Sequence, residues 1–384
     1  MNTRFASVAL CRWFHQVIAL LLLFGLCSPG RSADTVTVTP LGHGVYLKQF
    51  HYDNLYDSQQ SIFVIDANLN VPGVALRFPH LTGGKTAPVR TLAEGTPGAI
   101  AAVNAQFFDK HGSAQFLKIG GTLINPTRSA NVHDQQAIAV DAQGGVTILL
   151  RPKEGWPSLT GIPTLMASGS GLIANGSRVS FDPSDTTYAM RHPRTCVAMT
   201  SDNHLFIMVI DGRSPSAAGQ TGVEVQTTLL SLGKIVNAVN LDGGGSSTLW
   251  VNGSVLNRPS DKKERPVANA LVLLASPAQA HAHSLTVDFL SFQGKLKPRA
   301  TIRVVDASGV PLPGATVTGR FTGRVSQQSL SAVTDSDGVV TLLSPSTLSR
   351  GTTGFVIRSI SGSNLVYNPA ANSLTQATLR APKG

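Results

Sequence analysis

One segment near the middle of the chain constrains the fold more than any other. Residues 205–210 and 235–241 are continuous apolar runs, which are typical of strands buried on both faces. Between them, Thr221 and Glu224 have the spacing of a capping box, in which a hydroxyl and a carboxylate satisfy the first amides of a helix. The segment therefore predicts a β-α-β unit and, with it, an α/β first domain built on a mixed (α+β) sheet.

Each of the two apolar runs ends in an aspartate. Asp211 follows the first run and Asp242 follows the second. If the two strands are parallel neighbours, both carboxylates emerge at the same edge of the sheet, where ligands usually bind in open α/β folds. An antiparallel arrangement would separate the two carboxylates, and the sequence leaves both arrangements open.

A triple-glycine bend follows Asp242 directly. Gly243, Gly244 and Gly245 permit backbone conformations that are closed to other residues, and Ser246 adds a hydroxyl. Consecutive amides in such a bend can form a concave nest for an anion. A carboxylate beside an anion nest predicts chemistry on a phosphorylated or sugar-phosphate substrate. The alternative is a tight glycine turn between two strands.

The N-terminus has the layout of a secretory signal peptide. Arg4 and Arg12 precede an apolar run at residues 17–26, which is shorter than the ~20 residues that span a bilayer. We therefore expect residues 1–33 to be removed, and the mature protein to be periplasmic or secreted without stable membrane insertion. The bulky residue before Cys27 argues against a lipoprotein anchor.

The mature chain would keep one cysteine, Cys196, which excludes an internal disulfide. This cysteine lies in an apolar run, so we expect a buried thiol. Stability must then come from apolar cores, and roughly 350 residues suffice for two of them.

Composition changes across residues 276–284, which are small and polar and predict a linker. The first domain then covers residues 34–275. Residues 285–384 alternate in short segments separated by turn signals, which favours an all-β sandwich. This region is similar to bacterial immunoglobulin-like modules, through residues 310–317 and 334–339.

The formal net charge is +10. The basic residues are scattered and lack an interleaved aromatic pattern, so nucleic acid is not an expected partner, and anionic glycans or phosphate esters fit better. No zinc-binding helix motif is present, and we predict neither a cofactor nor a metal. Acidic side chains in oxygen-rich loops leave a divalent cation as an alternative. The sequence does not determine the oligomeric state.

Most of residues 90–275 resembles the phosphodiester glycosidase family. The motifs that carry this resemblance lie, in order, at residues 102–109, 172–176, 191–195, 209–213, 240–248 and 264–270. The resemblance implies hydrolysis of the C1–O bond of a sugar-1-phosphodiester, N-acetylglucosamine-like, in an envelope or extracellular glycan. The family usually has glycines where this chain has Ala105 and Gln106, and a small residue in place of Cys196, which leaves the substrate open.

Such a reaction needs a carboxylate near the anomeric carbon, because the sugar passes through an oxocarbenium-like state. We assign Asp242 as nucleophile or general base, and Asp211 as a second carboxylate that orients water or binds sugar hydroxyls. The alternative for both is ordinary Asp-Gly turn chemistry.

The substrate-binding residues follow from the charge and shape of a phosphodiester sugar. Arginine suits phosphate oxygens because its planar fork donates two hydrogen bonds. The predicted set comprises phosphate ligands (Arg194, Arg213, the amides of Gly243, Gly244 and Gly245, and Ser246), residues that shape the sugar site (Asn104 and Asp109), and Arg265, which closes it. Arginine–carboxylate pairing and turn capping by Asn104 are the structural alternatives.

Two other functions stay open at this level. One is a phosphodiesterase that cleaves the P–O bond rather than the C–O bond. The other is a glycan-binding protein of exopolysaccharide assembly, whose pocket no longer turns over.

Overall fold

The structure is a computed structural model, and it describes residues 34–128, 134–325 and 328–382. The predicted signal peptide, residues 1–33, lies outside the described residues. Among the residues that are described, no helix has the length and apolar character needed to cross a membrane.

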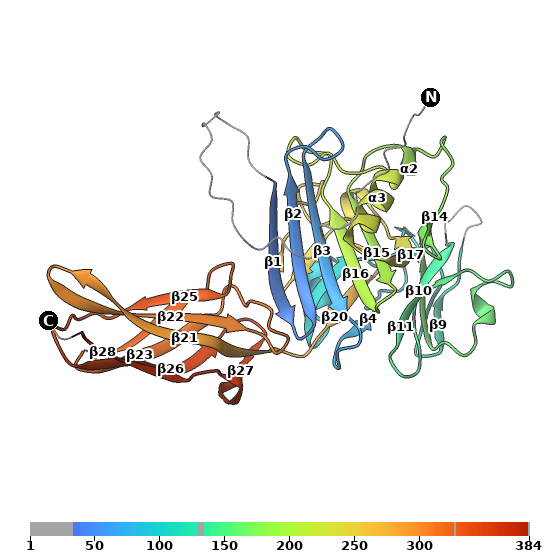
Figure 1. Cartoon of the computed structure of the whole chain (residues 1–384). Helices are drawn as coiled ribbons and strands as arrows, with labels where there is room; N and C mark the ends of the chain where they lie inside the picture. The colour runs from blue at the N-terminus through green and yellow to red at the C-terminus, as the bar shows by residue number, and fades with distance from the viewer. Residues whose placement is uncertain (1–33, 129–133, 326–327, 383–384) are drawn as a thin grey trace, which may run out of the picture. The chain divides into compact units, whose positions relative to one another are not determined.

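An eight-stranded sheet is the largest element of the first part of the chain (Figure 1). All of its neighbouring strands are antiparallel. In spatial order the strands are β1 (Thr35–Gly42), β2 (Val45–Tyr52), β3 (Gln60–Asn68), β16 (His204–Ile210), β15 (Arg194–Thr200), β17 (Ile235–Asn240), β13 (Gly171–Ala174) and β14 (Ser177–Arg178).

The predicted β-α-β unit is present, but its two strands are not neighbours. β16 and β17 each pair antiparallel with β15, so they run in the same direction with β15 between them. The connecting helix α3 (Gly222–Leu232) begins at Thr221 with the predicted capping box. Because β15 starts where β16 and β17 end, the inserted strand brings Arg194 to the edge that carries both aspartates.

Two further sheets and a short hairpin complete this part. One five-stranded sheet contains β19 (Ser254–Val255), β18 (Leu249–Val251), β5 (Ala99–Asn104), β20 (Ala270–Leu274) and β4 (Ala75–Arg77). The other contains β11 (Val146–Leu150), β10 (Gln136–Val140), β12 (Thr164–Ser168), β8 (Leu117–Ile119) and β9 (Thr122–Asn125). The hairpin pairs β6 (Phe108–Asp109) with β7 (Gly112–Ser113).

The central strands are buried on both faces although they are antiparallel. One core joins Val197 and Val239 of the large sheet to Val103 and Leu271 of the second sheet. On the opposite face of the large sheet, the side chains of α3 pack into a second core (Figure 1). This double burial explains the continuous apolar runs, which are otherwise typical of parallel strands.

Helices are scarce, and this corrects the α/β expectation. The described residues contain three α-helices, α1 (Val89–Glu94), α2 (Thr186–Ala189) and α3, and three 3₁₀ turns, η1 (Trp156–Ser158), η2 (Gly244–Ser246) and η3 (Pro369–Ala371). α1 packs on the outer face of the β5–β20 sheet. The domain is therefore β-rich, with antiparallel sheets, rather than the α/β domain on a mixed sheet that the sequence predicted.

The C-terminal part consists of two four-stranded sheets. The first contains β25 (Val339–Leu343), β22 (Lys295–Val305), β21 (Ala278–Phe292) and β27 (Leu365–Tyr367), and the second contains β24 (Ser329–Val333), β23 (Thr316–Gly323), β26 (Thr352–Ser361) and β28 (Gln376–Arg380). Both sheets contribute to one core, for example through Ile302 and Phe355. The assignment to immunoglobulin-like modules, and the domain boundaries, stay predictions.

The predicted linker is a strand for most of its length. Residues 278–284 form the first half of β21, which pairs with β22 and β27. The small alternating residues Ala278, Ala280 and Ala282 are buried, and Ala280 and Ala282 face the core of the sandwich. Small side chains here reflect close packing and not the flexibility that their composition suggested.

Candidate functional site

A cavity of about 340 Å³ opens at the edge where β16 and β17 end and β15 begins. Seven of the eleven predicted site residues line it, and the other four do not. The lining residues are Phe107, Thr186, Thr187, His192, Arg194, Arg213, Asn240, Asp242, Gly243, Gly244, Gly245 and Arg265.

The triple-glycine bend forms one wall of this cavity. Other side chains approach its backbone so closely that a larger residue would not fit. A Cβ at Gly245 would lie 2.1 Å from Nη2 of Arg265 and 2.4 Å from the Asp261 carboxylate oxygens. Gly244 has a φ of +60°, and a Cβ there would lie 3.1 Å from Nη2 of Arg213. The bend therefore lets two arginines reach the backbone beside Asp242.

Of the three amides predicted to form an anion nest, that of Gly244 is already engaged. It donates to the Pro193 carbonyl at 2.9 Å, which holds the bend against the start of β15. The Gly243 amide interacts with the Asp242 carboxylate. Positive charge at this site comes from arginine side chains instead.

Asp242 is the one carboxylate among the residues that line the cavity. Burial raises the pKa of its side chain to about 6, and the Ser246 hydroxyl, the Arg265 charge and the Gly243 amide lower this pKa by smaller amounts. The Ser246 Oγ atom lies near this carboxylate but has no partner at hydrogen-bond geometry among the described residues. A carboxyl group with this pKa can exchange a proton close to neutral pH.

The backbone of Asp242 is clamped on both sides. Its amide donates to the Ala105 carbonyl at 2.9 Å. Its carbonyl accepts a hydrogen bond of 2.5 Å from Nδ2 of Asn104, whose Oδ1 accepts from the Thr195 hydroxyl and the Thr248 amide. Asn104 is fully buried and does not line the cavity, so it positions Asp242 rather than shaping the sugar site directly as predicted.

Arg194 places a buried positive charge at the cavity. Its guanidinium donates to three backbone carbonyls, those of Gln220, Thr187 and Met190, at 2.6 to 3.0 Å. It also lies 5.6 Å from the centre of the Tyr188 ring. Burial lowers its pKa to about 10. Among the described residues Arg194 forms no ion pair with a carboxylate, although the charge of Asp185 raises the pKa of its guanidinium by a smaller amount.

His192 is a cavity residue that the sequence interpretation missed. Its Nδ1 lies 3.0 Å from Nη2 of Arg213. Arginine only donates, so Nδ1 accepts and the neutral ring carries its proton on Nε2. Burial lowers the pKa of His192, and the charges of Arg194 and Arg213 lower it further, so the ring is neutral at neutral pH. The available signal was its place within the 191–195 motif.

Asn240 is a second missed residue. It is 2% exposed, and its Nδ2 donates to the Leu241 carbonyl at 2.7 Å. Its Oδ1 has no hydrogen-bond partner among the described residues. Asn240 lines the cavity, and an unsatisfied buried acceptor is costly, so a ligand hydroxyl that reached Oδ1 would satisfy it.

Arg265 also lines the cavity, beside Gly245, and it is part of an ion pair. Its Nη2 is 2.7 Å from a carboxylate oxygen of Asp261, and both side chains are partly exposed. Such a pair contributes little stability, so its geometry is the relevant property. Asp261 holds Arg265 beside Gly245 and was also missed.

Asp211 does not line the cavity, which removes it from the predicted second-carboxylate role. Its carboxylate accepts hydrogen bonds of 3.0 Å from Nδ2 of Asn257 and from the Arg258 amide. Burial raises its pKa, and these donors lower it. Its oxygens are occupied by the segment that follows β19, so Asp211 fastens that segment to the end of β16.

The two remaining predicted residues also lie off the cavity wall. Asp109 is exposed in the β6–β7 hairpin and pairs with Arg128 at 2.8 Å. Hydrogen bonding by the His111 amide, followed by Arg128, lowers the pKa of Asp109. Ser246 is fully buried next to Asp242. Neither side chain is placed to contact a phosphate in the cavity.

Gln106, one of the departures from the family pattern, has a structural explanation. Its amide donates to the Phe116 and Ala167 carbonyls, and its oxygen accepts from Ser113 and Asn269. All four hydrogen bonds are 2.6 to 2.9 Å long, and the Gln106 side chain is buried away from the cavity wall. Gln106, which follows β5, thus joins β7 and β12 to the residues that directly precede β8 and β20.

The other departure, Cys196, is fully buried in β15. Burial raises the pKa of this thiol to about 12, so it is inert at neutral pH, as the sequence predicted. The described residues also contain no group of three His, Cys, Asp or Glu side chains placed to hold a metal ion.

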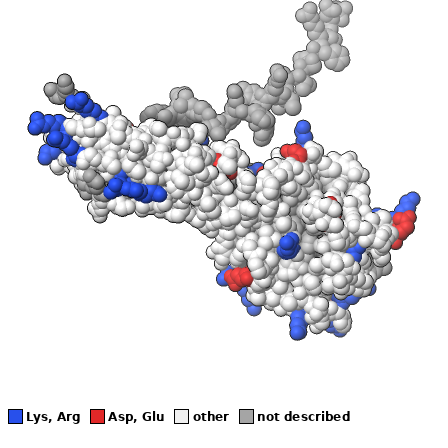
Figure 2. All heavy atoms as spheres, turned by 90° about the horizontal axis from the view of Figure 1, so that it is seen from below, with Lys and Arg blue, Asp and Glu red and all other residues white. Residues whose placement is uncertain are grey.

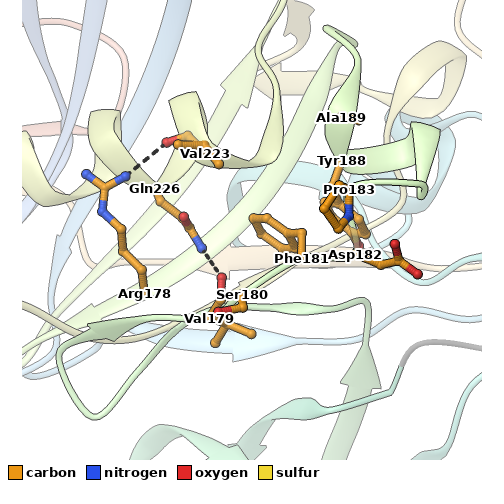
Figure 3. Close-up of a pocket in the computed structure, with 10 residues that line it drawn as sticks. All are labelled: Arg178, Val179, Ser180, Phe181, Asp182, Pro183, Tyr188, Ala189, Val223 and Gln226. Atoms are coloured by element: carbon orange, nitrogen blue, oxygen red, sulfur yellow. Dashed lines mark hydrogen bonds between the residues drawn. The ribbon is translucent and has the colours of Figure 1, made fainter.

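A second cavity, of about 380 Å³, lies where α2 meets α3 (Figure 3). Phe181 and Tyr188 stack there, with ring centres 4.6 Å apart. Figure 3 shows Arg178 bonded to the Val223 carbonyl and Gln226 bonded to that of Val179. None of the predicted site residues lines this cavity. Its residues support the back of α2, whose Thr186 and Thr187 face the first cavity.

Comparison with known proteins identifies the family. Residues 97–274 match the family model described as phosphodiester glycosidase. The chain is 41% identical over 91 residues to the "SPbeta prophage-derived uncharacterized protein YomE" of Bacillus subtilis (strain 168). The matched segment covers 23% of this chain and 14% of that protein. It is also 29% identical over 111 residues to the N-acetylglucosamine-1-phosphodiester alpha-N-acetylglucosaminidase of Mus musculus. That segment covers 27% of this chain and 21% of the mouse protein.

The fold has a counterpart among solved structures. The catalytic domain of zebrafish N-acetylglucosamine-1-phosphodiester alpha-N-acetylglucosaminidase, auto-inhibited by its pro-peptide, superposes with a TM-score of 0.51 at 17% identity. The match covers 63% of this chain and 88% of that one. At this identity the likeness concerns the fold alone, whereas the family assignment rests on the sequence match. Through residues 97–274, this chain contains a domain of the phosphodiester glycosidase family.

Proposed function

We propose that this chain hydrolyses the bond between C1 of a sugar and the oxygen of a phosphodiester, in an exported glycan. One observation carries the proposal. The cavity is lined by a single carboxylate, Asp242, with a pKa of about 6, and by Arg194, a buried arginine that forms no ion pair with a carboxylate among the described residues. A sugar-1-phosphodiester offers the complementary pair, an anomeric carbon that becomes positive and a phosphate that stays negative.

Arg194 and Arg213 bind the phosphate in this proposal. Arg194 is held by three carbonyls, and Arg213 is held by His192, so both are oriented before the substrate arrives. Preorganised charges of this kind stabilise a leaving group without reorganisation. Because a phosphodiester leaves as a weakly basic anion, charge neutralisation by arginine replaces much of the work of a general acid.

Asp242 acts at the sugar. In its ionised form the carboxylate stabilises the positive charge that develops at C1 as the C1–O bond breaks. The hydroxyl of water then bonds to C1, and the water proton passes to Asp242 or to bulk solvent, which leaves the free sugar and a phosphomonoester. The Oδ1 atom of Asn240 accepts from a sugar hydroxyl, which supplies its missing partner.

The substrate class and the export of the protein rest on further proposals. The name of the mouse relative supports the proposal that the substrate carries an N-acetylglucosamine-like sugar. The signal-like residues 1–33 support a periplasmic or secreted location. The C-terminal sandwich, as a second domain, would then bring the site to an envelope or extracellular glycan.

The position of bond cleavage tests the reaction directly. The purified chain is incubated with a panel of sugar-1-phosphodiesters in isotopically labelled water, and the products are separated by mass. Cleavage of the C–O bond puts the label in the sugar. Label in the phosphate would establish a P–O phosphodiesterase and overturn the proposal, and binding without any product would indicate a glycan-binding protein.

A further inference from the structure

One end of the C-terminal sandwich is strongly basic. Residues 285–384 contain ten lysines and arginines against four aspartates and no glutamate. Figure 2 shows Lys and Arg side chains gathered at one end of this sandwich, with no Asp or Glu visible among them. The charge is thus concentrated and not spread evenly over the module.

The loop at residues 348–351 brings these side chains together. Leu348 exchanges two backbone hydrogen bonds with Leu296, near the start of β22. The Gly351 carbonyl accepts from the Ala381 amide, directly after β28. The Arg324 amide donates to the Thr352 carbonyl, so the end of β23 lies there too. Three strand ends from both sheets therefore meet at this loop.

We define the basic end by the five cations on these strand ends and on the loop. They are Lys295, Lys297, Arg324, Arg350 and Arg380. Lys295, Arg350 and Arg380 are exposed. Lys297 lies 5.1 Å from the centre of the Phe292 ring, and the Arg324 side chain packs against Gly351, where a Cβ would lie 2.6 Å from Cδ.

The aspartates of the sandwich do not neutralise this charge. Asp288 is occupied by Arg299, whose Nε and Nη2 contact its two oxygens at 2.8 and 2.5 Å. Asp306, Asp335 and Asp337 lie in turns at the opposite end of β22. The ten steps from Lys295 to Val305 span about 33 Å at ~3.3 Å per residue. Screening at physiological salt removes most interaction beyond about 8 Å.

We propose that the basic end binds an anionic glycan chain that carries phosphodiester or carboxylate groups. Charge complementarity selects a polyanion, because exposed cations from three separate strands can meet successive charges along one chain. The choice of a phosphate-bearing glycan among polyanions rests on the proposed function, since the enzyme would then hold the polymer on which it acts.

Two other anionic partners fit less well. Stable binding to a membrane surface needs a broad apolar face beside the cations, whereas Phe292 is a single half-exposed ring in contact with Lys297. Binding to single-stranded nucleic acid needs a row of aromatic rings for base stacking, and the basic end has one such ring. Both partners are outcomes of the test.

The test measures binding of the full chain to a polysaccharide whose repeats are joined by phosphodiesters. The chain carries Asp242→Asn throughout, so that turnover does not consume the polymer. We expect binding that weakens as salt is raised, and a loss of about tenfold in affinity on adding Lys295→Gln with Arg350→Gln. The matched control is Arg303→Gln with Arg358→Gln, which removes two exposed charges elsewhere on the sandwich and should change affinity less than about twofold.

Several results would overturn the proposal. These are equal losses in the two double variants, no binding at low salt, or tighter binding to anionic phosphatidylglycerol vesicles or to DNA than to the polysaccharide. Failure here is distinguishable from failure of the proposed reaction. Hydrolysis of a small soluble sugar-1-phosphodiester by the chain with Asp242 intact should be unchanged by Lys295→Gln with Arg350→Gln, and glycan binding does not require hydrolysis.

Discussion

The Nδ1 atom of His192 lies 3.0 Å from Nη2 of Arg213 at the mouth of the candidate site. Arg213 has a φ of +59° and is exposed, so this contact is what directs its guanidinium toward the glycine bend. His192 therefore acts on the substrate through Arg213, as a positioning residue.

Replacement of His192 tests this role. In His192→Asn the side-chain oxygen can accept from Arg213, whereas His192→Ala removes the acceptor. We expect the Ala variant to raise KM about tenfold with a smaller change in kcat, and the Asn variant to recover most of that loss. Steady-state kinetics on a soluble sugar-1-phosphodiester provides the comparison. Equal losses in both variants would show that the imidazole itself takes part in the reaction.

Arg194 is expected to tolerate no substitution, even by lysine. Its planar guanidinium reaches three carbonyls at once, and a single ammonium cannot reproduce that geometry. Arg194→Lys should therefore lower kcat/KM by about a hundredfold or more. Arg178→Lys, at an exposed arginine beside the second cavity, is the control and should retain activity. Comparable activity of the two variants would contradict the assignment of Arg194 to the phosphate.

Gly245 should resist enlargement because of what approaches it. A Cβ there would displace Arg265 and Asp261, which lie within 2.4 Å of its position. We expect Gly245→Ala to raise KM strongly while the protein stays folded. Gly253→Ala is a suitable control, because Gly253 has a φ of +92° with open space around it. That control should cost about 1 kcal/mol of stability and leave KM unchanged.

The raised pKa of Asp242 has a consequence for stability that depends on pH. Burial raises this pKa from 3.8 to about 6, so the folded state binds the proton more tightly than the unfolded state does. The folded protein therefore loses stability as pH rises from about 4 to about 6, by up to about 3 kcal/mol at ~1.4 kcal/mol per unit. Asp242→Asn removes the ionisation and should gain stability relative to the wild type across this window.

Urea denaturation of both proteins at pH 4, 5, 6 and 7 measures the trend. Asp182→Asn is a control that should show the opposite trend of stability with pH, because the Ser184 hydroxyl and amide lower the pKa of Asp182. The stability of that variant relative to the wild type should fall as pH rises. A difference between Asp242→Asn and the wild type that is the same at every pH would contradict a raised pKa at Asp242.

Local features of the fold were predictable from the sequence, and long-range ones were not. The capping box of Thr221 and Glu224 formed as predicted because it depends on four consecutive residues. The insertion of β15 between β16 and β17 depends on pairing across the whole sheet, and no local pattern encodes it. The apolar runs signalled double burial correctly, but antiparallel strands with α3 on one face satisfy that signal as well as parallel strands do.

The same division applies to the site. Asp242 and the three glycines occupy one short segment, and the cavity contains all of them. Asp211 has an equivalent place after its strand, yet Asn257 and the Arg258 amide take its oxygens. Those partners are more than forty residues away in sequence, so its different role was not visible. His192 and Asn240 were missed because their contacts, and not their neighbours in sequence, give them importance.

The most direct test of the account compares the two aspartates by substitution with asparagine. Asp242→Asn should lower the turnover of a sugar-1-phosphodiester by about a thousandfold or more, with substrate binding retained. Asp211→Asn should reduce the free energy of unfolding, because its carboxylate accepts a hydrogen bond from the buried Asn257, and leave the turnover of the folded fraction within a few-fold of the wild type. Full turnover in Asp242→Asn, or equal loss in a folded Asp211→Asn, would contradict the placement of the chemistry at Asp242.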